Sequence, residues 1–246
     1  MSHIHIPDGV IAPAWLVLGY AVTALALALA VRQTGREDLR KKLPRLGLVS
    51  AFMLLAMSVP LGLLPVHLNL TVLAGILLGP WLGLVAVFIV NFILALTGHG
   101  GITVAGLNTL VVGSEAVMGY YFFFALRRRL RPATAAAVAT ALALVFSLAL
   151  MFATLGLTHI DPALVFYEDH HEEQVIEAGG LDIAAAGHES HHEGAGISLA
   201  RLARIALPIS LAGIIVEAAV TAMITGYLLK VRPGLIDGPA PPAAAE

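Results

Sequence analysis

The chain has 246 residues, of which 59% are hydrophobic and only 12% are charged, with a formal net charge of −2 at pH 7 and a mean hydropathy of +0.89. Soluble domains carry about 25% charged residues, so this composition excludes an ordinary soluble domain and indicates a membrane protein. Cysteine is absent, which excludes disulfides, thiolate zinc sites and iron–sulfur clusters. The sequence contains no Gly-Lys pair and hence no phosphate-binding loop of the Gly-x-x-x-x-Gly-Lys type. If ATP drives transport by this protein, another subunit must bind the nucleotide.

The apolar segments are long enough to cross a bilayer as helices. A single helix over 70–97 would be roughly 42 Å long, which exceeds the roughly 30 Å hydrocarbon core. Gly79-Pro80 interrupts that stretch, and proline removes a helix hydrogen bond, so we expect two short spans there. The predicted fold is an all-α, polytopic membrane helical bundle with about seven transmembrane helices. Their expected positions are near 11–31, 46–64, 68–80, 81–97, 103–126, 133–157 and 203–229.

The basic residues predict the orientation of the bundle. Twelve of the fourteen Lys and Arg residues follow the first, fifth or last span. Basic residues remain on the cytoplasmic side of a membrane, so seven spans place the N-terminus outside and the C-terminus in the cytoplasm. We therefore expect a multi-pass protein of the cell inner (cytoplasmic) membrane. The twelve residues are Arg32, Arg36, Arg40, Lys41, Lys42, Arg45, Arg127, Arg128, Arg129, Arg131, Lys230 and Arg232.

The chain is expected to form a single transmembrane domain over 1–232, followed by a disordered, Pro- and Ala-rich tail over 233–246. Two outer segments lie within that domain: residues 1–10, expected to bind metal, and a long His-rich loop over 158–200. With the predicted orientation, all ten histidines face outward, which favours a metal that arrives from outside. They are His3, His5, His67, His99, His159, His170, His171, His188, His191 and His192.

The N-terminal segment combines histidines with a terminal amine. No basic residue precedes the first apolar run, so we expect no cleavable signal peptide and a mature terminus that differs at most by loss of Met1. If Met1 is lost, the amine of Ser2 and the backbone nitrogen and imidazole of His3 form a chelate. If Met1 remains, the amine, two amides and the His3 imidazole can fill four positions. Tetragonal nitrogen sets of this kind suit Ni(II) and Cu(II).

Three motifs carry a resemblance to a known family. They are His5-Ile6-Pro7-Asp8-Gly9-Val10-Ile11-Ala12-Pro13, then Pro65-Val66-His67-Leu68 followed by Leu78-Gly79-Pro80-Trp81, and Gly98-His99-Gly100-Gly101-Ile102-Thr103 with Gly106-Leu107-Asn108. With these motifs the chain resembles the CbiM/NikM family, the substrate-binding membrane subunits of energy-coupling factor transporters for cobalt and nickel. The resemblance covers roughly residues 5–125.

The resemblance implies a near-square-planar nitrogen site. In the family it uses the terminal amine, the backbone nitrogen and imidazole of the second residue, and a further histidine that His67 matches. The family usually begins Met-His-Ile-Pro-Asp-Gly, whereas further residues precede His5 in this chain, so His3 takes the position close to the amine. If Met1 is lost, His67 or His5 supplies the fourth nitrogen. The resulting candidate ligands are Met1 if retained, Ser2, His3, His5, His67 and His99, with Asp8 and Asn108 as second-shell residues.

The resemblance also implies the partners. They are a transmembrane coupling subunit and two ATPase subunits, with a small accessory membrane subunit as a further candidate. Membrane lipids are expected contacts, and nucleic acid is not. The chain itself is expected to catalyse no reaction and to hold no cofactor, because Co(II) or Ni(II) is the transported substrate.

Two other functions compete with this interpretation. Glu115 and Glu217 are the only carboxylates well inside the predicted spans, and charged residues at that depth tend to be functional. They could form the proton pathway of a self-sufficient secondary metal carrier, or they could hydrogen-bond near helix ends. An intramembrane metal hydrolase is disfavoured, since the spans carry no histidine at their centres and no His-Glu-x-x-His motif.

Overall fold

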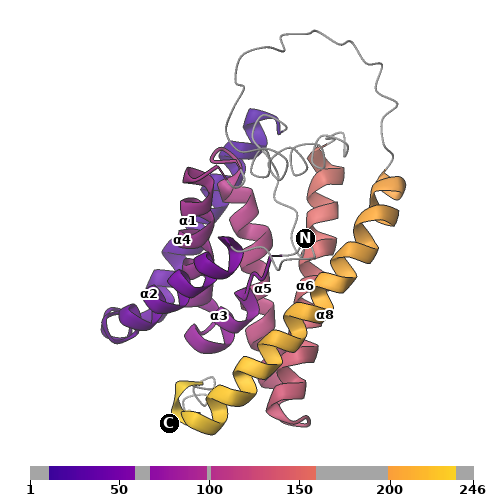
Figure 1. Cartoon of the computed structure of the whole chain (residues 1–246). Coiled ribbons are helices and arrows are strands. Elements are labelled where there is room, and N and C mark those ends of the chain that lie inside the picture. Colours follow the sequence, from indigo (N-terminus) through magenta and orange to yellow (C-terminus); the bar gives the residue numbers. More distant parts are fainter. Residues whose placement is uncertain (1–10, 59–66, 99–100, 159–198, 237–246) are drawn as a thin grey trace, which may run out of the picture.

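The structure is a computed structural model that describes residues 11–58, 67–98, 101–158 and 199–236. Within these ranges the chain forms seven α-helices and one 3-10 turn and contains no strand, which confirms the predicted all-α bundle (Figure 1). The elements are α1 (Pro13–Thr34), α2 (Arg36–Ser58), α3 (Thr71–Leu78), α4 (Pro80–Leu96), α5 (Ala105–Leu126), α6 (Pro132–Thr158), α8 (Leu199–Val231) and η1 (Pro233–Leu235).

Four of the described helices are long and apolar enough to cross a membrane, which agrees with a multi-pass membrane protein. They are α1, α5, most of α6, and the Ser210–Val231 part of α8. A fifth apolar helix, α4, has 17 residues and is slightly shorter. The described residues therefore supply the helical framework that the hydropathy pattern predicts.

The predicted break at Gly79-Pro80 is confirmed, because α3 ends at Leu78 and Pro80 is the first residue of α4. Gly79 has a φ of 86°, which glycine adopts without strain. The helix before the break is shorter than the expected 68–80. It has eight residues and is about 12 Å long, because residues 67–70 are not helical. Residues 68–70 of this non-helical segment lie within the span expected over 68–80.

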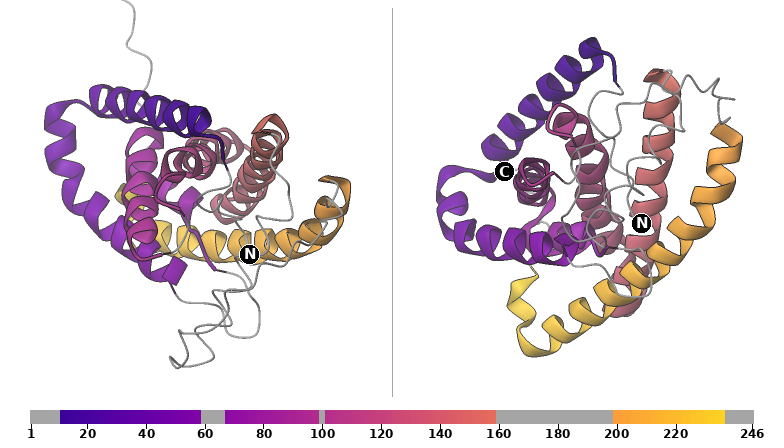
Figure 2. Two further views of the ribbon diagram at one scale, coloured as in Figure 1. Left: turned by 90° about the horizontal axis from the view of Figure 1, so that it is seen from above. Right: turned by 45° about the horizontal axis from the view of Figure 1, so that its top comes forward.

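Helix α5 lies at the centre of the bundle. It packs against α1, α3, α4 and α6, while α8 packs along α6 and also touches α3. Figures 1 and 2 show α8 as a long helix that crosses the bundle beside α6, with α1 and α2 on the opposite side of α5. Residues of α5 can therefore contact most of the other helices.

Small residues bring α3 unusually close to α5. A Cβ atom added to Gly75 would collide with the carbonyl oxygen of Ala116, and one added to Gly83 of α4 would lie 3.0 Å from the Cα of Gly75. Glycine permits this close approach because it has no side chain. The contact fixes the middle of α3 against α5 next to Glu115, which precedes Ala116.

The described chain continues past the expected domain boundary at 232. Residues Pro233–Leu235 form η1, and Ile236 is buried against an apolar cluster that includes Phe123 of α5. The burial of Ile236 explains why the chain remains ordered after the last helix. The rest of the tail expected to be disordered, 237–246, lies outside the described residues.

Candidate functional site

The candidate site is built around the non-helical segment 67–70, which leads into α3. His67 begins this segment; its side chain is half-buried and its Nδ1 atom is buried. The next residues turn sharply into the helix, since Leu70 is the N-cap residue and its carbonyl accepts the first helical bond from Ala74 N at 2.9 Å. The position of the His67 imidazole therefore depends on what fixes residues 69 and 70.

The first fixed point is a hydrogen bond from Asn69 to α5. The Asn69 side-chain nitrogen donates to Glu115 Oε2 at 3.2 Å, with Asn69 and Glu115 both buried. Buried polar groups are costly unless they are hydrogen-bonded, so this contact lowers the cost of burying both the amide and the carboxylate. It joins the segment that carries His67 to the middle of the central helix.

The second fixed point joins the same segment to α8. The backbone N–H of Leu70 donates to Glu217 Oε1 at 3.1 Å, and Glu217 is fully buried. Leu70 has a φ of 57°, a left-handed conformation that costs a non-glycine residue roughly 1–2 kcal/mol. Its side chain is buried in the main apolar cluster. The hydrogen bond to Glu217 and the burial of the leucine side chain both stabilise this strained turn.

Two buried carboxylates hold the segment that carries His67. Glu115 and Glu217 come from different helices and accept hydrogen bonds from adjacent residues of one segment. Asn69 is two residues from His67, so their Cα atoms are within about 7 Å. The segment that begins at His67 is therefore held by buried carboxylates from two helices, α5 and α8.

Asn108, the predicted second-shell amide, is buried in the first turn of α5. Its neighbour Gly106 makes the contact between α1 and α5: a Cβ atom there would lie 2.8 Å from the backbone nitrogen of Tyr20. Thr23 donates to the Gly106 carbonyl at 2.7 Å, and the Tyr20 hydroxyl donates to the carbonyl of Ile102. The third sequence motif therefore joins α1 to α5, and the second-shell role of Asn108 stays a prediction.

Most of the other predicted site residues lie outside the described part of the chain. This applies to Met1, Ser2, His3, His5, Asp8 and His99, and to the outer loop from 159 to 198. Among the described residues, no three His, Cys, Asp or Glu side chains gather as they would around a metal ion. His67 is thus the one predicted ligand that the described ranges place, and the assignment of the others stays a prediction.

Sequence reasoning identified Glu115 and Glu217 as unusual but did not identify their partners. The two glutamates could be recognised because a carboxylate is unusual in an apolar helix. The partners are separated from them by 46 and 147 positions in the chain, and no local pattern encodes such a distance. Both carboxylates accept hydrogen bonds, as one of the two interpretations expected, but they do so from the middle of α5 and of α8 and not near the ends of those helices.

Comparison with known proteins shows which family this chain matches. The family model described as "CbiM: Cobalt uptake substrate-specific transmembrane region" matches residues 5–235. The chain is 34% identical over 135 residues to "Cobalt transport protein CbiM" of Geobacter sulfurreducens, covering 52% of this chain and 39% of that protein. It is 32% identical over 126 residues to "Fused nickel transport protein NikMN" of Rhodobacter capsulatus, covering 48% and 36%. The matched stretches span between 36% and 68% of the length of the curated relatives.

Solved structures share the fold. A chain described as the crystal structure of a transition metal transporter superposes with a TM-score of 0.67 and 23% identity, covering 92% of this chain and 93% of the other. A truncated transition metal transporter gives a TM-score of 0.64, also at 23% identity. The helical arrangement in Figure 1 therefore occurs in experimentally determined proteins.

Proposed function

Because the chain belongs to the family of the cobalt uptake substrate-specific transmembrane region (CbiM), we propose that it binds Co(II) or Ni(II) at the outer face of the membrane as the substrate-specific subunit of an ATP-driven energy-coupling factor importer. The observation that carries this proposal is the position of His67. Its segment is held by Glu115 of α5 and Glu217 of α8 within an apolar bundle. An imidazole on a segment held in this way is suited to be a metal ligand.

In this proposal His67 completes a nitrogen site with the N-terminal segment. Ser2, His3 and His5 supply amine, amide or imidazole nitrogens, Met1 supplies the amine if it is retained, and His99 is a further candidate. Asp8 and Asn108 orient the ligands by hydrogen bonds, as carboxylates and amides do around many metal sites. A four-nitrogen set of this kind favours Ni(II) by its geometry, although protein geometry can override intrinsic metal affinity.

The energy for import comes from other subunits. The proposed partners are a transmembrane coupling subunit and two ATPase subunits, with a small accessory membrane subunit as a further candidate. The absence of a phosphate-binding loop supports this division of labour. The chain then binds and presents metal without catalysing a reaction, in the inner membrane with its basic clusters on the cytoplasmic side.

The alternative is a proton-coupled secondary carrier, and the two buried carboxylates are the observation that favours it. In a carrier, Glu115 and Glu217 would take up and release protons as metal moves. In the structure both accept hydrogen bonds from the segment that carries His67. This geometry gives them a positioning role and supports the binding-subunit proposal over the carrier.

Uptake of radioactive nickel and cobalt into lipid vesicles separates the two functions. We expect vesicles that contain this chain alone to bind metal without concentrating it, with or without a proton gradient. Co-reconstitution with the coupling and ATPase subunits should give concentrative uptake that requires ATP.

A matched pair of variants completes the design. Glu115→Gln and Glu217→Gln keep a hydrogen-bond acceptor but cannot exchange protons. ATP-driven uptake should persist in both. Gradient-driven uptake by the chain alone that disappears in either variant would contradict the binding-subunit proposal and establish the carrier.

A further inference from the structure

A basic and aromatic cluster at the C-terminal end of α5 has no role in the metal site. Four arginines lie between α5 and α6, and the last turn of α5 is rich in aromatic residues. The guanidinium carbon of Arg127 lies 5.1 Å from the ring centroid of Phe124 and 5.7 Å from that of Phe123. Arg127 is therefore held against the aromatic rings, whereas Arg128 and Arg129 are exposed.

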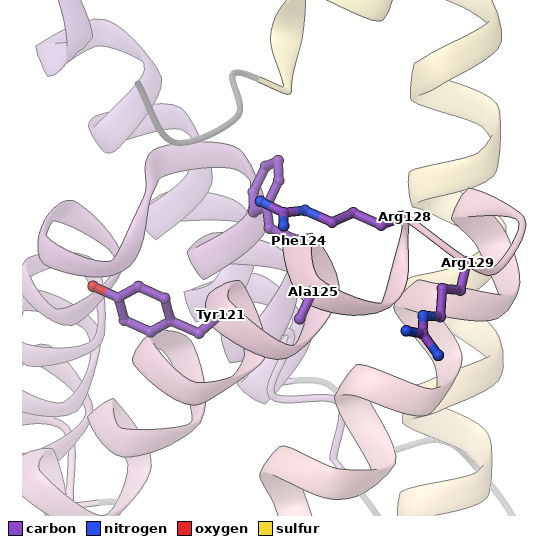
Figure 3. A pocket seen from close by; sticks show the side chains of 5 residues that line it. All are labelled: Tyr121, Phe124, Ala125, Arg128 and Arg129. Atoms are coloured by element: carbon purple, nitrogen blue, oxygen red, sulfur yellow. The ribbon is translucent and has the colours of Figure 1, made fainter. Parts of the chain in front are cut away.

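The exposed arginines border a hollow of about 430 Å³ on α5. Its lining consists of Tyr121, Phe124, Ala125, Arg128 and Arg129 (Figure 3). Figure 3 shows the Arg128 side chain extending from the turn after α5 toward Phe124, whereas the Arg129 side chain points to a different side. Phe124 is buried, while Tyr121 and Ala125 are exposed at the surface of a membrane-spanning helix.

The lining is apolar at one end and positively charged at the other, which complements the acyl chains and the anionic headgroup of a phospholipid. From Tyr121 to Leu126 the helix rises about 8 Å with apolar and aromatic surface, and the turn that follows carries the two guanidinium groups. Guanidinium groups bind phosphate oxygens with paired hydrogen bonds. Within the described residues neither Arg128 nor Arg129 forms an ion pair, so both are available for an anion.

We propose that this hollow binds one anionic phospholipid, with its phosphate on Arg128, with Arg129 as a second positive charge beside the headgroup, and with an acyl chain along Ala125 and Tyr121. Clusters of basic residues directly next to a membrane helix on the cytoplasmic side attract anionic headgroups. The positive-inside rule places these arginines on that side. An isolated phosphate would use the guanidinium groups alone, whereas a phospholipid also covers the exposed apolar surface beside them.

The test is lipid retention by the full chain in nanodiscs of phosphatidylglycerol and phosphatidylcholine, read by native mass spectrometry. We expect the wild-type chain to retain one phosphatidylglycerol in preference to phosphatidylcholine. The double variant R128Q/R129Q should lower its occupancy about tenfold or more, because two positive charges are lost. Ala125→Phe should also lower it, since the larger side chain fills the hollow while every charge remains.

The matched control is R40Q/K41Q, which removes two exposed charges from α2 and should leave retention unchanged. Equal loss in the control, or full retention in Ala125→Phe, would show diffuse charge attraction and overturn the proposal. Displacement of phosphatidylglycerol from the wild type by millimolar inorganic phosphate would assign the arginines to a free anion and overturn the lipid. If R128Q/R129Q does not fold, Ala125→Phe and the phosphate competition still decide the matter.

Discussion

Replacing His67 by alanine should abolish tight binding of nickel and cobalt while the helical fold remains intact. The loss of a second-shell residue typically costs about 10–100-fold in metal affinity, so the loss of a direct ligand should cost at least 100-fold. The fold should tolerate the change because His67 is half-buried and lies outside the helices. Equilibrium competition with a chelating dye measures the affinity, and thermal unfolding in detergent checks the fold.

Two controls show whether the effect is specific to this imidazole. His188→Ala removes a histidine from the outer loop, and a deletion of residues 166–195 removes most of that loop. Both should retain tight binding, and the deletion should slow uptake only at low metal concentration. A deletion that weakens binding as strongly as His67→Ala would place the site in the loop instead.

Removing the acceptor from Glu217 should destabilise the protein and weaken metal binding together. In Glu217→Met a side chain of similar size leaves the Leu70 N–H buried without its carboxylate, which costs about 1–3 kcal/mol. The left-handed turn at Leu70 then loses one of its two stabilising contacts, and the His67 segment becomes less ordered. Thermal unfolding with and without nickel measures both consequences.

Glu217→Gln is the matched variant, because its amide oxygen can accept the same hydrogen bond. It should retain most of the stability and most of the affinity. If Glu217→Gln is as damaged as Glu217→Met, then negative charge matters instead of the acceptor. That result would contradict the positioning role of Glu217.

The sequence predicted the features of the fold that local signals encode. The break between α3 and α4 followed from Gly79-Pro80, whose backbone preferences are strong and local. The start of α3 was expected too early, because Leu68 and Leu70 extend the apolar run although His67 and Asn69 are polar. Their non-helical conformation depends on Glu217, which is far away in the sequence.

The same contrast applies to the site. His67 could be singled out because its motif resembles a metal-transport family, and Glu115 and Glu217 because carboxylates are rare in apolar helices. The contact that positions the segment arises only when α3 packs on α5 at Gly75 and α8 passes alongside. Pairing of this kind is a property of helix packing, which a single sequence does not display. The hollow for which we propose a lipid likewise became recognisable only from the placement of Arg128 beside Phe124.

X-ray absorption spectroscopy of the chain loaded with one equivalent of nickel tests the central claim most directly. The proposed site predicts a near-square-planar set of nitrogen ligands with imidazole scattering, and His67→Ala should remove one imidazole from that set. A six-coordinate spectrum dominated by oxygen ligands, or a spectrum unchanged in His67→Ala, would contradict the claim that His67 and the N-terminal segment together bind the metal.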